Sequence, residues 1–117
     1  MTVDTIKLTQ DLQDATVAGG EAARLVDDNG SCNLDHVVLL TGKTKSVIKK
    51  AGHVENAIKA ADVHQYYAGR KHAIIGYHLR FPFNPFGQAS KRTAAVKAAA
   101  KLLTDRGWDV SIHYQLD

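Results

Sequence analysis

The 117-residue sequence contains a single cysteine, Cys32, which excludes any disulfide bond within the chain. No run of apolar residues approaches the roughly 20 that a membrane-spanning helix needs. The first ten residues, MTVDTIKLTQ, lack the apolar core of a secretion signal. These absences predict a cytoplasmic protein in a reducing compartment, without a membrane partner.

The composition is otherwise that of an ordinary globular domain. The chain has 44% hydrophobic and 23% charged residues, with no internal repeat and no low-complexity segment. A chain of this length can bury a core without disulfides or metals. We therefore expect a single domain over residues 1–117, made of an N-terminal helix within residues 1–30 and a core over residues 36–117.

The net charge of +3 conceals an uneven distribution along the chain. Residues 1–35 contain seven acidic and two basic residues, a net charge of −5. Residues 36–117 contain five acidic and thirteen basic residues, a net charge of +8. This asymmetry favours an anionic partner for the second part, although a solvated surface gives the same pattern.

Apolar periodicity predicts two long helices. In the first helix, which Asn29-Gly30 is expected to end, apolar or small residues form one stripe: Leu8, Leu12, Ala15, Gly19, Ala22 and Val26. A second long helix is predicted over residues 89–106 and ends before Gly107. Its apolar face consists of Ala95, Val96, Ala99, Leu102 and Leu103.

Shorter segments complete the expected fold. A buried strand is predicted at 36–41, helical pieces at 44–52 and 53–62, a hairpin at 63–81 that turns near Gly69-Arg70, and a half-buried strand at 108–117. After the first helix, the order β-α-β-β-α-β predicts an α+β, ferredoxin-like fold, in which both helices cover one face of an antiparallel sheet. The other face would meet water, the N-terminal helix or a second copy of the chain.

Two short motifs suggest a phosphate-binding loop and a catalytic cysteine, but neither meets the requirements of that site. TGKT at 41–44 has the ending of a phosphate-binding loop, but Val37 stands where that loop needs its first glycine, so a strand-to-helix turn is the better interpretation. Cys32 and His36 would lie about 13 Å apart in an extended segment, too far for a nucleophile and its base. We predict no enzymatic activity and no cofactor.

Three of the six histidines, His36, His78 and His113, fall on three different predicted strands. Three imidazoles on one face of a sheet are able to bind zinc and to leave a coordination position open. No carboxylate is evident to orient them, and the interpretation that we favour is scattered surface histidines without a metal.

The strongest candidate for a binding site is GQASKRT at 87–93, which opens the second long helix. Free amides and the helix dipole favour an anion there, whereas cations in a first turn oppose the dipole unless an anion compensates them. Ser90 is also a good N-cap, and a cap needs no ligand. The predicted ligand-binding residues are Gly87, Gln88, Ser90, Lys91, Arg92 and Thr93, extended by Lys97, Arg70 and Arg80.

GSCNLD at 30–35, GQASKRT at 87–93 and RGWDVSIHYQLD at 106–117 together resemble segments of small bacteriophage and prophage accessory proteins. The resemblance covers about half the chain and brings no assigned activity with it. It implies an accessory protein in the cytosol of a bacterial host. Many such proteins act by binding, and inhibitors of host defence are among them.

The sequence therefore favours a non-enzymatic protein that binds an anionic ligand, either a nucleotide or nucleic acid, at the basic helix N-terminus. The first alternative is a protein–protein inhibitor of host defence or a phage assembly component. Its interface would be the stripe of the first helix or an uncovered sheet face, and a homodimer is possible. A metal-dependent enzyme is the last alternative.

Overall fold

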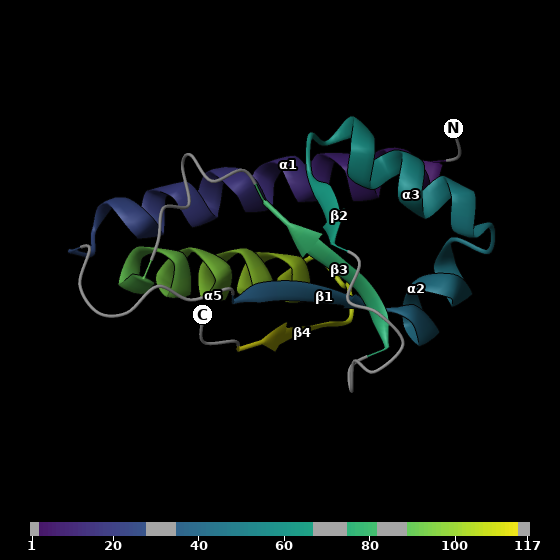
Figure 1. Cartoon of the computed structure of the whole chain (residues 1–117). Coiled ribbons are helices and arrows are strands. Elements are labelled where there is room, and N and C mark those ends of the chain that lie inside the picture. Colours follow the sequence, from purple (N-terminus) through teal and green to yellow (C-terminus); the bar gives the residue numbers. More distant parts are fainter. Residues whose placement is uncertain (1–2, 28–34, 67–74, 82–88, 115–117) are drawn as a thin grey trace.

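The computed structural model describes residues 3–27, 35–66, 75–81 and 89–114 (Figure 1). The chain begins with a helix. Its helices and strands are, in order, α1 (Val3–Arg24), β1 (His36–Leu40), α2 (Thr41–Val47), α3 (Ala51–Ala60), β2 (His64–Tyr66), β3 (Gly76–Arg80), α5 (Ala89–Asp105) and β4 (Val110–His113). Gly69-Arg70, the predicted hairpin turn, lies outside the described residues.

The four strands form one antiparallel sheet in the order β2-β3-β1-β4, so the predicted α+β class is confirmed. In the central pair Val37 lies opposite Leu79, and in the outer pair Val37 lies opposite Ile112. The side chains of Val37 and Leu79 are fully buried in the core. Because side chains alternate along a strand, His36, Val38 and His78 point to the second face of the sheet.

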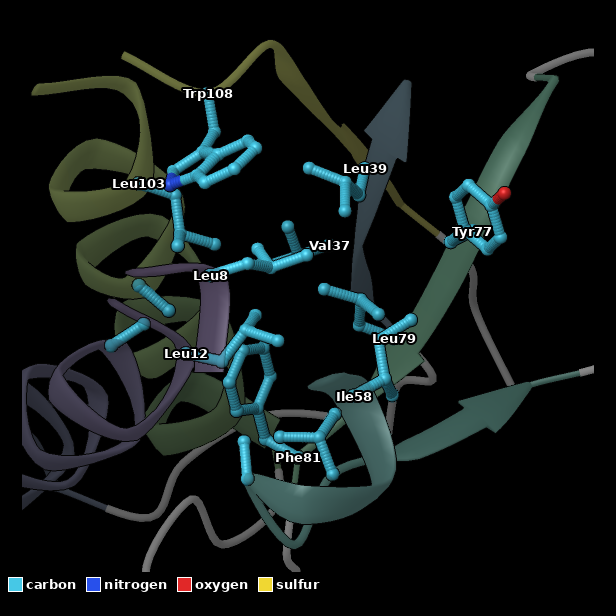
Figure 2. Packing of buried hydrophobic residues seen from close by; sticks show 14 of the residues in the cluster. Leu8, Leu12, Val37, Leu39, Ile58, Tyr77, Leu79, Phe81, Leu103 and Trp108 are labelled. Carbon is cyan, nitrogen blue, oxygen red and sulfur yellow. The ribbon is translucent and has the colours of Figure 1, made fainter. Parts of the chain in front are cut away.

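The N-terminal helix packs in the same layer as the other helices and does not cover the second face of the sheet. Figure 2 shows Leu8 and Leu12 of α1 directed to the same core as Val37 of β1 and Leu103 of α5. Helices α1 and α5 lie side by side and run in opposite directions (Figure 1). The predicted stripe of α1 therefore faces the protein's own core and is not available to a partner.

Helix α5 matches its predicted span and buried face. Ala95, Ala99 and Leu103 are fully buried. The helix ends at Asp105, and Gly107, two residues beyond it, has a φ of +94°, a left-handed conformation that a glycine adopts without strain. The N–H of Gly107 donates to the carbonyl of Thr104, and the N–H of Trp108 donates to that of Leu103, which satisfies two carbonyls at the helix end.

Three local predictions are wrong. Residues 41–44 form the first turn of α2 and not a turn before it, because the chain passes directly from β1 into the helix at Thr41. Gly52 lies inside α3, and the break between the two helices falls at residues 48–50. Helix α1 ends at Arg24, before the predicted end at Asn29-Gly30.

A buried carboxylate ties α1 to the turn between α5 and β4. Asp11 is 3% exposed and accepts hydrogen bonds from Lys7 Nζ (2.6 Å), Arg106 Nη1 (2.7 Å) and Trp108 Nε1 (2.8 Å). Burial by itself raises the pKa of Asp11, but the hydrogen bonds from Lys7, Trp108 and Arg106 together hold it below its ordinary value. The carboxylate is therefore ionised in the folded protein at neutral pH.

Within the described residues, every helix is either too short or too polar to cross a lipid bilayer.

Candidate functional site

The first turn of α5 lies against the beginning of β1, through contacts with Asp35. Arg92 is 8% exposed, and its Nε donates a 2.9 Å hydrogen bond to the backbone carbonyl of Asp35. The hydroxyl of Thr93 lies 3.1 Å from the Asp35 carboxylate and 3.3 Å from the carbonyl of Ala89. These contacts hold a buried guanidinium at the end of the sheet where β1 begins and β3 ends.

Arg80, the last residue of β3, brings a second guanidinium to the same place. Burial lowers the pKa of Arg92, the nearby charge of Arg80 lowers it further, and Asp35 partly opposes both effects. Arginine stays charged regardless, so the lowered pKa of Arg92 reflects first the cost of burying its guanidinium and second the repulsion from the charge of Arg80. We call Arg80 and Arg92 the arginine pair.

The described residues neutralise the arginine pair only in part. Among the described residues, no carboxylate forms an ion pair with Arg80, which is exposed at its strand end. Asp35 is the acid whose charge acts on Arg92. Two positive charges and one negative charge leave a net charge of +1 where the sequence predicted an anion site.

Lys91 has a different partner from the one that the sequence predicted. Its ammonium donates to the carbonyl of Ala23 at 2.9 Å and to that of Val26 at 2.6 Å. Ala23 is in the last turn of α1 and Val26 lies two residues beyond its end, where a positive charge favours the helix dipole. The ammonium is turned toward α1 and away from the arginine pair.

The remaining predicted residues are spread over both described and undescribed segments. Lys97 is exposed on α5 beyond the first turn, and Ser90 is half-buried within that turn. Gly87, Gln88 and Arg70 lie outside the described residues. Ala89, the first residue of α5, has a φ of +52°, which costs an alanine roughly 1 kcal/mol.

The three strand histidines meet on the second face of the sheet. His36 Nε2 lies 2.7 Å from His78 Nδ1, a hydrogen bond between two rings that are 4% and 5% exposed. The ring of His113 has its centroid 5.1 Å from that of His36 and 6.5 Å from that of His78. The favoured interpretation of scattered surface histidines is therefore wrong, and we call these three residues the imidazole cluster.

The strand register explains this convergence and links the cluster to the arginine pair. His36 lies opposite His113 on β4, and His78 lies opposite Val38, next to His36 along β1. One step further in the same register brings Arg80 beside His36, and Arg80 itself lies opposite His64 on β2. A row of basic side chains thus crosses the end of the sheet on its second face.

The geometry of the cluster is that of a shared proton. Nitrogen atoms 2.7 Å apart need one N–H and one lone pair between them, whereas two ligands of one zinc ion stand farther apart, at about 3.3 Å for tetrahedral bonds of about 2.05 Å. Among the described residues, no group of three histidine, cysteine, aspartate or glutamate side chains is arranged to hold a metal ion.

Sequence reasoning missed Asp35, which positions both Arg92 and Thr93. Asp35 is 5% exposed although it directly precedes a strand, where an acid is ordinarily solvated. The sequence feature that could have indicated Asp35 is an acidic residue directly before a buried strand, in a chain whose second part has an excess of basic residues. Its partners are 57 and 58 residues away, a separation that local patterns do not report.

Comparison of the chain with protein-family models, with curated proteins and with solved structures yields no significant match.

Proposed function

We propose that this chain is a non-enzymatic binding protein that captures a phosphate-bearing ligand, a nucleotide or nucleic acid, at the arginine pair. The observation that carries the proposal is a buried Arg92 on which the charge of Arg80 acts, Arg80 being exposed and without an ion-pair partner among the described residues. Guanidinium groups donate in a planar fork that matches phosphate oxygens, and a bound phosphate would relieve the repulsion between them.

The backbone at this position adds to the attraction. Arg92 is in the first turn of α5, where the helix dipole is positive and favours an anion. The proposed site consists of Arg80 and Arg92, with Asp35 and Thr93 positioning Arg92. Lys91 is left out because its ammonium is bound to the end of α1.

The finer assignment of the fold belongs to the same proposal. A ferredoxin-like plan is supported by the strand order β2-β3-β1-β4 and by antiparallel pairing throughout. The chain adds α1 to the helical layer and uses two helices, α2 and α3, between its first two strands. An accessory role in a bacteriophage, in the cytosol of its host, is the setting that the sequence resemblance suggests.

Binding is tested with three probes that share phosphate chemistry: ATP, a short single-stranded oligouridylate and a short DNA duplex. Fluorescence anisotropy with labelled probes, repeated over a series of salt concentrations, measures affinity and its salt dependence. For a nucleic acid we expect affinity to fall steeply with salt, with a slope near 0.9 for each duplex phosphate neutralised and about 0.7 for a single strand. A preference for ATP, with a shallow salt dependence, would identify the ligand as a nucleotide.

Arg80→Ala is the decisive variant because Arg80 is exposed and its removal leaves the core intact. We expect affinity to weaken roughly tenfold, and the salt slope for a nucleic acid to decrease by about one. Lys45→Ala is the matched control, since Lys45 is an exposed cation on α2, at the opposite end of β1. No binding of any of the three probes, or equal losses for the two variants, would refute the proposal.

A further inference from the structure

The imidazole cluster adjoins the proposed ligand site but is not needed to explain it. His36 directly follows Asp35, whose carbonyl holds Arg92, and the strand register sets Arg80 beside His36. His36 and His78 are nevertheless buried and are joined by a 2.7 Å hydrogen bond. The protonation of a buried pair of ionisable rings next to two arginines depends on the charges around it.

We infer that the hydrogen-bonded pair of His36 and His78 is a proton-linked subsite, which takes up one proton when an anionic ligand binds to the arginine pair. Affinity for phosphate-bearing ligands then rises as the pH falls. This inference rests on the proposed function and adds to it the protonation state in which the ligand is held.

The hydrogen bond limits how many protons the pair can hold. One imidazole must donate and the other must accept across the 2.7 Å contact, so the arrangement fits a neutral pair or a pair with one excess proton. Two fully protonated rings would point two N–H groups at each other. The pair of His36 and His78 is therefore able to take up a single proton without rearrangement of either ring.

The surroundings oppose that proton until a ligand arrives. Among the described residues, the charged and titratable groups around the cluster are Asp35 before β1, Arg80 on β3, Arg92 on α5, and His64 and Tyr66 on β2, of which Tyr66 lies opposite His78. Their fixed charges sum to +1, and burial of His36 and His78 adds a cost of desolvation. A phosphate bound at the arginine pair makes the net charge of this region negative, so the addition of a proton to the histidine pair becomes favourable.

Linkage turns this change into a measurable affinity. If binding brings one proton, affinity increases up to tenfold for each pH unit by which the pH falls, over the range in which imidazole titrates, ordinarily around 6.5. By reciprocity, the ligand strengthens proton binding by the same factor as the proton strengthens ligand binding.

The test uses the full chain and probes that do not themselves titrate between about pH 6 and pH 8: oligouridylate without terminal phosphates, and sulfate if ATP is the probe that binds. Isothermal titration calorimetry near pH 7 in PIPES and in Tris, whose ionisation enthalpies differ, counts the protons taken up. We expect an uptake approaching one proton and an affinity that rises about fivefold to tenfold per pH unit on lowering the pH.

A variant pair assigns the effect to the cluster. His78→Gln is expected to remove most of the proton uptake and the pH dependence while binding at high pH persists. His53→Gln, on α3 and away from the cluster, should leave both unchanged. Because the calorimetric count is made on the unaltered protein, an unstable variant does not decide the outcome. Equal affinity across the pH range with no buffer dependence overturns the proton linkage alone, whereas no binding at any pH overturns the proposed function as well.

Discussion

The indole Nε1 of Trp108 donates a 2.8 Å hydrogen bond to Oδ2 of Asp11, across 97 residues of sequence. The same carboxylate accepts hydrogen bonds from Lys7 and Arg106, and the ammonium of Lys7 lies 5.0 Å from the centroid of the Trp108 ring. One acid thus joins α1 to the turn that follows α5. Two predictions follow from its burial and charge.

Asp11→Asn should lower the free energy of unfolding by about 2 kcal/mol. The substitution removes a buried charge that accepts three hydrogen bonds, and hydrogen bonds to charged groups are the stronger ones. Lys7 and Arg106 are about half-exposed, so both can turn to water and the loss stays below that of a fully buried pair. Denaturant unfolding measures the change. Asp14→Asn, which removes a more exposed partner of Arg106, should cost under about 0.5 kcal/mol.

Lowering the pH should remove the contribution of Asp11 to the free energy of unfolding. Because the folded-state pKa of Asp11 lies below the ordinary value of 3.8, the unfolded chain takes up this proton first as the pH falls. The stabilisation is therefore present above about pH 4 and is lost as the pH drops through the folded-state pKa. Unfolding free energies measured across this range should fall more steeply for the unaltered protein than for Asp11→Asn. Parallel curves for the two proteins would contradict the assignment.

Gly76→Ala should destabilise the sheet by about 1–3 kcal/mol, the usual cost of an overpacked site. A Cβ at this position would lie 2.5 Å from the backbone oxygen of Leu39 and 2.8 Å from Cγ1 of Val38, so the strands would have to separate. Gly52→Ala is the matched control. Its Cβ meets nothing within 4 Å, and alanine favours the helix, so we expect stability to rise by up to about 1 kcal/mol. Thermal unfolding of both variants measures the contrast.

Lys91→Ala should reduce stability by about 1 kcal/mol without changing ligand affinity. The ammonium satisfies two carbonyls at the end of α1, a role worth about as much as other charged contacts at helix ends. Denaturant unfolding and the anisotropy measurement with the same probes separate the two effects. An affinity loss as large as that of Arg80→Ala, with unchanged stability, would restore Lys91 to the ligand site.

Much of the fold is predictable from periodicity. The stripe of α1, the buried face of α5 and the alternation of β4 each arise from residues that repeat at the spacing of their element. Boundaries are less predictable: the β-branched Thr41 and the glycine that follows it favour a turn, yet the chain enters α2 there because tertiary packing outweighs local propensity.

The candidate site is predictable only in part, because register and long-range contacts decide it. The sequence places Arg80 and Arg92 in one candidate set, and it places His36, His78 and His113 on three strands. It contains no measure of strand register, which is what brings the imidazoles together. The partners of Lys91 lie 65 and 68 residues earlier in the chain, so its contact with α1 has no local signal.

The antiparallel pairing of α1 with α5 sets the order of events on the ribosome. The first helix to emerge has its apolar side chains matched to residues near the other end of the chain, from Lys91 to Trp108. Until those residues have been synthesised, the side of α1 that packs on α5 lacks its native partner, so completion of the fold is postponed to the last moments of translation. The nascent chain must keep its earliest segment soluble for nearly the whole of its synthesis.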